Sequence, residues 1–327
     1  MRQRCRGSVA LLRLTLALAP ALALPPAQAA PFAYITNQGS HDVSVIDLAL
    51  QQVVATVKVG RSPAGVVASS RAGQVFVSNP DSKTISVIDM RGQRLAATLP
   101  AGEGPVGLDA SPDGTLLAAA DWYRNRLLLI DPRTPTAPYG EVALGRAPAG
   151  VAVHSDGNTV FVAERDDDSV AVVDARERRV RARVPVGSHP FALHFDAARE
   201  RLYALNVQSN DVSVIDTHRL VVLATIGVGR APYGAALAHA GTLLYVTNQH
   251  GNSVSVIDAE TLRVLRTLDG FAYPEGIAAH DDRVYVVNWM DDNVSVLDAE
   301  SGRTLSRIAT GQNSRGFGAF IGSPLPP

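Results

Sequence analysis

Side chains that could coordinate a cation recur at a fixed spacing along the chain. A small polar residue ends a short apolar run at seven positions: Asn37, Asn79, Asp121, Glu164, Asn206, Asn248 and Asn288. Carboxylate and amide oxygens are ligands that hard divalent cations prefer, and Asp121, Glu164 and Asn206 follow one another in this series. A structural role also explains the series, because the position is polar in every unit and Asn and Asp side chains stabilise turns. We predict the structural role.

A second series of carboxylates follows the first at a constant distance. It comprises Asp47, Asp89, Asp131, Asp174, Asp216, Asp258 and Asp298, and both series step by 42, 42, 43, 42, 42 and 40 residues. Turn-like residues follow these Asp residues, so each carboxylate is expected to accept the backbone N–H two residues on. The Asn residues of the first series are expected to do the same and to adopt the left-handed backbone that Asn tolerates.

The elements that must position these residues are short strands. Each unit has four apolar segments separated by turn residues, and no segment has the period of about 3.6 residues typical of an amphipathic helix. In five units one segment opens with Pro-x-Gly, as in Pro63-Ala64-Gly65. A four-stranded sheet of this size cannot bury both faces alone, so neighbouring sheets must cover one another around an axis. The sequence predicts an all-β, seven-bladed β-propeller with four antiparallel strands per blade.

The two ends of the chain predict how the ring closes. The first strand after residue 30 is of the Asn-ending kind, and no Pro-x-Gly strand precedes it. A segment of the missing kind, 314–320, follows the last unit at the usual spacing. We expect this C-terminal strand to complete the N-terminal blade, so that no sheet edge is left open there. The predicted domains are a signal peptide at 1–30, the propeller at 31–322 and a short tail at 323–327.

The N-terminus has the pattern of an export signal. Four arginines precede the apolar run 14–24, and Ala27-Gln28-Ala29 supplies the small residues of a cleavage site. Cleavage would remove the only cysteine, Cys5, and the loss of four arginines would change the net charge from −1 to about −5. We expect a periplasmic or secreted monomer with no membrane span after cleavage. A mildly acidic protein has no general affinity for nucleic acid.

These motifs resemble a known family. The Tyr-Val-Thr-Asn segment at 245–248, the Val-Ser-Val-Ile-Asp segments and the Gly-x-x-Pro-x-Gly joints are similar to those of the YVTN family of β-propeller repeat proteins. The resemblance covers nearly the whole chain after residue 30 and implies the propeller fold. It implies no particular activity, because the shared residues recur in every blade. At family level the repeat also resembles haem d1-type propellers.

One face of the predicted ring departs from the repeat. The loop into each Pro-x-Gly strand and the loop after each Asn-ending strand open on this face, which we call the mouth. Large, charged or aromatic side chains replace small ones there in several blades, and such side chains contribute most to binding surfaces. The predicted ligand- or partner-binding residues are Trp122, Arg165, His189, Phe191, Tyr233, Glu275, Trp289 and Arg315.

No catalytic motif accompanies the mouth, since the sequence lacks Gly-x-Ser-x-Gly, His-Glu-x-x-His and a phosphate-binding glycine loop. We predict an exported, non-catalytic scaffold that binds an unidentified small ligand or protein at its mouth, with no catalytic residue and no metal site. Three alternatives remain open: a redox or haem-handling protein with His189 as axial ligand, a metal-dependent lactonase using Asp121, Glu164 and Asn206, and a single-stranded nucleic-acid binder. Asp109 and His194, which replace small residues near the axis, are further candidates for binding a ligand or an ion.

Overall fold

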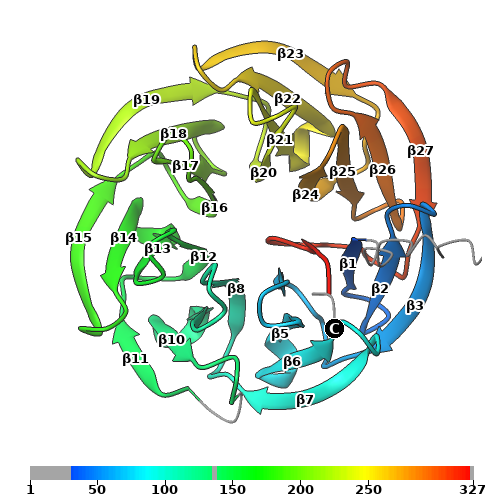
Figure 1. Ribbon diagram of the computed structural model, residues 1–327. Helices are drawn as coiled ribbons and strands as arrows, with labels where there is room; N and C mark the ends of the chain where they lie inside the picture. The colour runs from blue at the N-terminus through cyan, green and yellow to red at the C-terminus, as the bar shows by residue number, and fades with distance from the viewer. Residues whose placement is uncertain (1–30, 135–137, 325–327) are drawn as a thin grey trace, which may run out of the picture.

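The computed structural model describes residues 31–134 and 138–324, so the predicted signal peptide at 1–30 lies outside the described residues. Seven four-stranded antiparallel sheets surround one axis (Figure 1). The all-β, seven-bladed propeller predicted from the repeat is therefore confirmed. None of the helices in the described ranges has the length and apolarity that crossing a bilayer requires.

The blades are numbered in chain order. Blade 1 contains β1 (Phe32–Asn37), β2 (Asp42–Asp47), β3 (Gln52–Lys58) and β28 (Ile321–Gly322). Blade 2 contains β4 (Val66–Ser69), β5 (Gln74–Asn79), β6 (Thr84–Asp89) and β7 (Arg94–Pro100), and blade 3 contains β8 (Pro105–Ala110), β9 (Leu117–Asp121), β10 (Arg126–Ile130) and β11 (Gly140–Ala143). Blade 4 contains β12 (Pro148–Val153), β13 (Thr159–Glu164), β14 (Ser169–Asp174) and β15 (Arg179–Pro185).

Blades 5 to 7 follow the same order. Blade 5 contains β16 (Pro190–Asp196), β17 (Arg201–Asn206), β18 (Asp211–Asp216) and β19 (Val221–Gly227). Blade 6 contains β20 (Pro232–Ala238), β21 (Leu243–Asn248), β22 (Ser253–Asp258) and β23 (Arg263–Asp269), and blade 7 contains β24 (Pro274–His280), β25 (Arg283–Asn288), β26 (Asn293–Asp298) and β27 (Thr304–Ala309). Four 3-10 turns follow Asn-ending or equivalent strands: η1 (Pro80–Ser82), η2 (Trp122–Arg124), η3 (Arg165–Asp167) and η4 (Gln249–Gly251).

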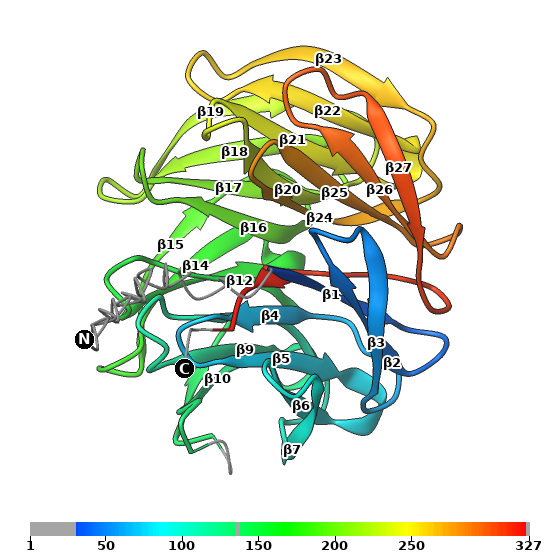
Figure 2. The same ribbon diagram turned by 45° about the vertical axis from the view of Figure 1, so that its right-hand side comes forward.

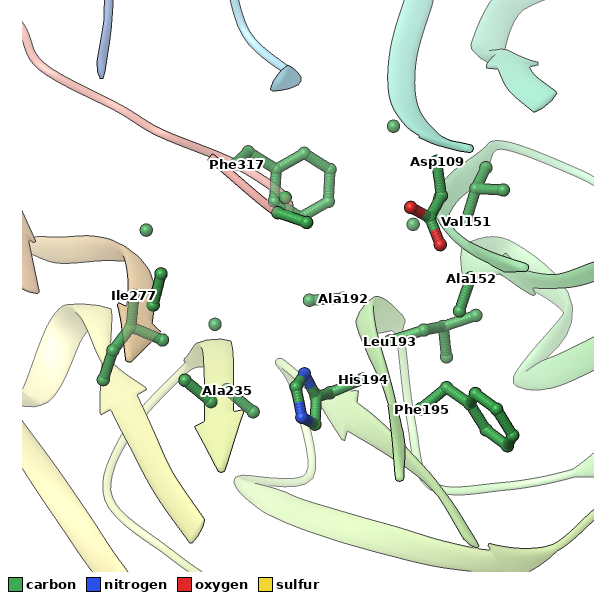
Figure 3. Close-up of a pocket in the computed structure, with 18 of the residues that line it drawn as sticks. Asp109, Val151, Ala152, Ala192, Leu193, His194, Phe195, Ala235, Ile277 and Phe317 are labelled. Carbon is green, nitrogen blue, oxygen red and sulfur yellow. The ribbon is translucent and has the colours of Figure 1, made fainter. Parts of the chain in front are cut away.

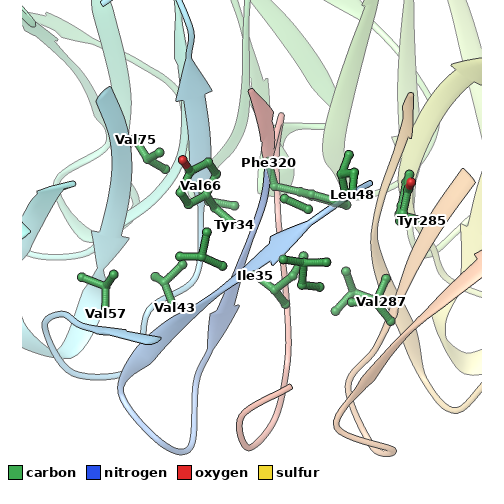
Figure 4. Packing of buried hydrophobic residues seen from close by; sticks show 14 of the residues in the cluster. Tyr34, Ile35, Val43, Leu48, Val57, Val66, Val75, Tyr285, Val287 and Phe320 are labelled. Carbon is green, nitrogen blue, oxygen red and sulfur yellow. The ribbon is translucent and has the colours of Figure 1, made fainter. Parts of the chain in front are cut away.

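The core lies between the blades. The two middle strands of each sheet are buried on both faces, whereas the outermost strand is largely exposed, as the burial of β5, β6 and β7 illustrates. An aromatic ring occupies the third position of the Asn-ending strand in six blades and is fully buried or nearly so: Tyr34, Phe76, Phe161, Tyr203, Tyr245 and Tyr285. Figure 4 shows one such cluster, in which residues of blades 1, 2 and 7 pack together. Each sheet is thus covered by its neighbours.

The first polar series ties the strands of each blade together. In the five Asn blades the side-chain amide donates a hydrogen bond to a Ser seven residues on, at 2.9–3.0 Å. Asp121 and Glu164 have no Ser at that position, and their carboxylates bind Arg126 and Arg183 of their own blades instead. The predicted structural role is therefore confirmed, but the Asn side chains fill it by donating to these Ser residues and not, as expected, by accepting the N–H two residues on.

The expected left-handed backbone at these Asn residues is wrong. Asn79 and Asn248 have φ of −124° and −111°, and positive φ occurs four residues later, at Lys83 and Asn252. The reason is that the Asn still belongs to its strand, and the chain reverses only after the following turn. Most of the Asp series behaves as predicted: the Asp47 carboxylate accepts the N–H groups two and three residues on, at 2.8 and 2.9 Å. Asp174 and Asp298 instead accept the N–H three residues on.

The Pro-x-Gly glycines allow the innermost strands to crowd together at the axis. A Cβ atom on Gly107 would lie 2.1 Å from the carbonyl oxygen of Ala149 in the next blade, closer than any real Cβ approaches. Gly150 meets the Phe191 carbonyl in the same way, at 2.4 Å. A side chain at these positions would push neighbouring blades apart.

The C-terminal segment closes the ring, as predicted, but in an irregular form. Residues 314–322, which we call the closing strap, pair with β1 through β28 and through the bridge Asn37–Ser314. The same strap also pairs with blade 2, where the N–H groups of Val66 and Ala68 donate to the carbonyl oxygens of Phe317 and Ala319 at 2.8 Å. The predicted regular strand at 314–320 is wrong in extent. Gly318, at φ 122°, breaks the strand geometry and lets the strap approach Val66, so the strap reaches the centre of the ring (Figures 1 and 2).

Candidate functional site

The two kinds of mouth loop lie side by side in each blade. The backbone N–H of Trp122 donates to the Gly104 oxygen at 2.9 Å, and that of Trp289 donates to the Tyr273 oxygen at 3.2 Å. The residue after the polar series is therefore held against the loop that precedes Pro-x-Gly. This pairing places the predicted binding residues on one common face.

A row of contacting side chains crosses the mouth. The Arg165 guanidinium carbon lies 5.6 Å from the centre of the Trp122 ring, a cation–π contact. The Trp122 and Phe191 ring centroids are 6.1 Å apart, and Phe191 stacks on Tyr233 at 4.7 Å with 29° between the planes. Trp122, Arg165 and Phe191 are half-buried, whereas Tyr233 is buried. Four predicted residues from four consecutive blades thus form one row that is partly open to solvent.

A buried polar group continues this row towards the closing strap. The Arg315 guanidinium donates to the Tyr233 hydroxyl, and its Nε lies 2.9 Å from Glu275 Oε2. This contact joins the two side chains as a buried ion pair. The Gln249 amide donates to the other Glu275 oxygen at 2.7 Å. Burial raises the pKa of Glu275, and the charge of Arg315 opposes this shift. Tyr233 and Glu275 therefore support the mouth from beneath and present little surface of their own.

His189 and Trp289 occupy different parts of the mouth. His189 borders the row: its backbone N–H donates to Asp168, and its ring Nε2 lies 3.7 Å from Asp166, which also binds Arg165. Trp289 lies apart from the row. Its indole N–H donates to the Gln38 side chain at 3.3 Å, and its ring contacts Tyr273.

A cavity of about 350 Å³ lies along the axis beneath this row (Figure 3). The innermost strands β8, β12, β16, β20 and β24 and the closing strap supply its walls, which consist of glycines and apolar side chains apart from two polar residues. These two are Asp109 and His194. Burial raises the pKa of Asp109 to about 6 and lowers the pKa of His194 to about 4.

Phe317 is the contact residue that the sequence analysis missed. Its ring lies 5.1 Å from Phe191 and 5.8 Å from Tyr233, so it separates the row from the cavity. A signal for it exists in the sequence. The residue three after the repeat's Pro is aliphatic in the other blades, as at Val66 and Leu108, whereas the residue three after Ser314, at the same place in the repeat, is aromatic.

The residues proposed for a divalent metal are committed to other contacts. Asp121 accepts the N–H groups of Glu103 and Gly104 as well as Arg126. Glu164 and Asn206 likewise bind partners in or beside their own blades. Among the described residues, no group of three or more His, Cys, Asp or Glu side chains is arranged to hold a metal ion.

The ring of His189, the predicted axial ligand of a haem, faces Asp166, and His189 is not among the residues that line the axial cavity.

The fold and its repeating polar series define a seven-bladed repeat propeller. More particularly, the chain belongs to the YncE-like β-propeller family, whose model matches residues 136–317. A search of the curated proteins gave no match.

Solved structures share the fold at low sequence identity. Hydrazine synthase of Kuenenia stuttgartiensis is similar with a TM-score of 0.73 and 18% identity, over 87% of this chain and 99% of that one. A functionally unknown protein from Desulfotomaculum acetoxidans DSM 771 gives a TM-score of 0.76 and 14% identity, over 90% and 99% of the two chains. The dihydro-haem d1 dehydrogenase NirN in complex with DHE gives 0.66 and 16%, over 92% of this chain and 77% of that one. These likenesses extend to the fold alone.

Proposed function

We propose that this chain is an exported, non-catalytic scaffold whose mouth binds a segment of a partner protein. The observation that carries the proposal is the solvent-accessible part of the row. It consists of three large side chains on three neighbouring blades, each partly exposed: Arg165, Trp122 and Phe191. Aromatic and Arg residues dominate the binding energy of protein interfaces. The repeat does not require this row, because blade 2 holds Ala64 and Pro80 at the equivalent positions.

The filled centre of the mouth supports a protein partner over a small ligand. Phe191, Tyr233 and Phe317 are in mutual contact there, and Arg315 packs over Tyr233 at 5.7 Å. Small ligands prefer concave sites that bury most of their surface. A protein segment can instead cover a filled surface whose large side chains are already ordered.

The charges of the mouth argue against a nucleic-acid partner. The arginines that would contact phosphates each lie beside a carboxylate: Arg165 is 2.6 Å from Asp166, and Arg124 is 3.6 Å from Glu103. Phosphate binding depends on cations that are free to replace counterions. Paired arginines supply little of this free charge.

A peptide selection tests the proposed mouth surface. Peptides selected on the wild-type protein from a random phage library should lose at least about tenfold in affinity for W122A/R165A. The matched control is Y139A/R178A, which removes a cation–π pair of the same 5.6 Å separation. Tyr139 lies at the far end of β10, away from the mouth, since its N–H donates to Leu129. Peptides that bind W122A/R165A as well as wild type, or that depend equally on the control pair, would refute the proposal.

Export has a separate test. Protein expressed with its complete N-terminus in a Gram-negative host should be recovered from the periplasm with its first residue near Pro31. Recovery of the intact chain from the cytoplasm would contradict export and leave the mouth proposal standing.

A further inference from the structure

The axial cavity is a second candidate site, independent of the mouth. It is built deep in the ring, and Phe317 separates it from the aromatic row. Its volume of about 350 Å³ lies within the usual range for small-molecule sites. The repeat does not require its polar residues, because the positions equivalent to Asp109 and His194 hold Val67, Ala152 and Ala278 in other blades.

Asp109 keeps acceptor capacity that faces the cavity. Its two oxygens accept one backbone N–H each, from Ala110 at 2.9 Å and from Val153 at 2.8 Å. A carboxylate has about four lone-pair sites, so two remain for a ligand. The side chain is half-buried, and solvent therefore reaches it. The backbone N–H groups hold the carboxylate in place without neutralising it.

His194 is the other polar group of the cavity. Its nitrogens are absent from every hydrogen bond and ion pair among the described residues, and its ring lies near Tyr203, at 6.4 Å between centroids. Burial favours the neutral imidazole, which has one acceptor and one donor nitrogen. Figure 3 shows the Asp109 carboxylate and the His194 ring bordering the same open space from β8 and β16.

The charge and surface of the walls define the chemistry of the occupant. Asp109 is the only side chain of the lining that is charged at neutral pH, and the lining contains no Lys or Arg. A half-buried carboxylate with no cation beside it favours a ligand that supplies one. Phe195 and Phe317 add aromatic surface, which attracts both cations and apolar rings.

We propose that the axial cavity binds a small organic ammonium ion with an apolar body, its N–H groups donating to Asp109 and its polar remainder meeting His194. Two ligating side chains are fewer than the three protein ligands of an open zinc site. A neutral apolar molecule would leave the Asp109 charge unpaired. An anion would be repelled by it.

Titration of the full mature chain with benzylamine, followed by calorimetry and by the imidazole NMR signals, tests this proposal. Benzylamine should bind saturably and shift the His194 signals while leaving those of His189 at the mouth unchanged. Benzyl alcohol, which has nearly the same shape and no charge, should bind at least about tenfold more weakly. The mouth variant W122A/R165A should bind benzylamine like wild type.

Two variants in the cavity complete the test. D109N should lower the benzylamine affinity at least about tenfold. D109N could also disturb the fold, because Asp109 accepts two backbone N–H groups. H194L avoids this difficulty, since the His194 ring makes no hydrogen bond among the described residues. H194L should lower the benzylamine affinity severalfold. Equal affinity for benzylamine and benzyl alcohol, wild-type affinity in both variants, or no binding of benzylamine at millimolar concentration would each overturn the proposal.

Discussion

The axial cavity places two titratable side chains in surroundings that shift their pKa values in opposite directions. Desolvation favours the neutral form of each group, so the pKa of Asp109 rises to about 6 and that of His194 falls to about 4. Folding thus favours a proton on Asp109 and disfavours one on His194. Their contributions to the free energy of unfolding oppose each other between pH 4 and pH 6.5.

This opposition can be separated with H194Q and D109N. Asp109 has a folded pKa above its ordinary value of 3.8, so its contribution to stability grows as the pH falls through 6. His194 has a folded pKa below its ordinary value of 6.5, so stability is lost as the pH falls from 6.5 to 4. Relative to wild type, H194Q should gain about 3 kcal/mol on going from pH 7 to pH 4, and D109N should lose about as much. Urea denaturation at both pH values measures the free energy of unfolding of the three proteins. If it changed by the same amount in all three between pH 7 and pH 4, the opposite pKa shifts of Asp109 and His194 would be contradicted.

The carboxylates at two positions of the first polar series depend on their own arginines. Asp121 is fully buried, and among the described residues Arg126 is the cation that pairs with it. R126M should therefore destabilise the fold by about 2–3 kcal/mol, because a buried charge loses its partner while two backbone N–H bonds remain. R133M, which removes a more exposed partner of Asp131, should cost less than about 1 kcal/mol. Equal losses in chemical denaturation would show that the Asp121 pair is not structural.

At the scale of elements, the closing strap contributes through its buried side chains more than through strand pairing. Regular pairing is limited to β28, yet Phe320 is fully buried in the cluster that joins blades 1, 2 and 7. F320A should cost about 3–5 kcal/mol. L305A, on the exposed outer strand β27, should cost less than about 1 kcal/mol. A loss for F320A no larger than that for L305A would mean that the strap is not part of the core.

The sequence predicts the blades well because every blade repeats the same physical solution. The Asp47 turn, the Pro-x-Gly joints and the spacing of both polar series depend on local chemistry, and the structure confirms them. The strap was predicted only in outline, because its course depends on Gly318 approaching Val66 in another blade. The burial of Tyr233 and Glu275 could not be predicted either. It depends on contacts with Arg315 and Phe317, which belong to the closing strap and lie far away in the sequence.

At the scale of the whole molecule, the ring has one seam, and Arg315 crosses it. This residue belongs to the strap that completes blade 1, and it contacts Tyr233 of blade 6 and Glu275 of blade 7. In a ring each blade is stabilised by its neighbours, so weakening the seam should open the blades beside it first. The far side of the ring, such as blade 5, should be affected less.

The seam can be tested with R315M and R315M/E275L. R315M leaves the buried Glu275 carboxylate without its cation and should cost about 3–5 kcal/mol. The double variant removes both charges and should recover part of this loss, although the Gln249 amide loses its acceptor. In hydrogen exchange, R315M should accelerate the amides of β1 more than those of β17 in blade 5. The double variant should restore part of that protection. If β1 and β17 accelerated equally, or if the double variant stayed as labile as R315M, the seam would be no weaker than any other blade interface, and the buried pair would not be what holds it.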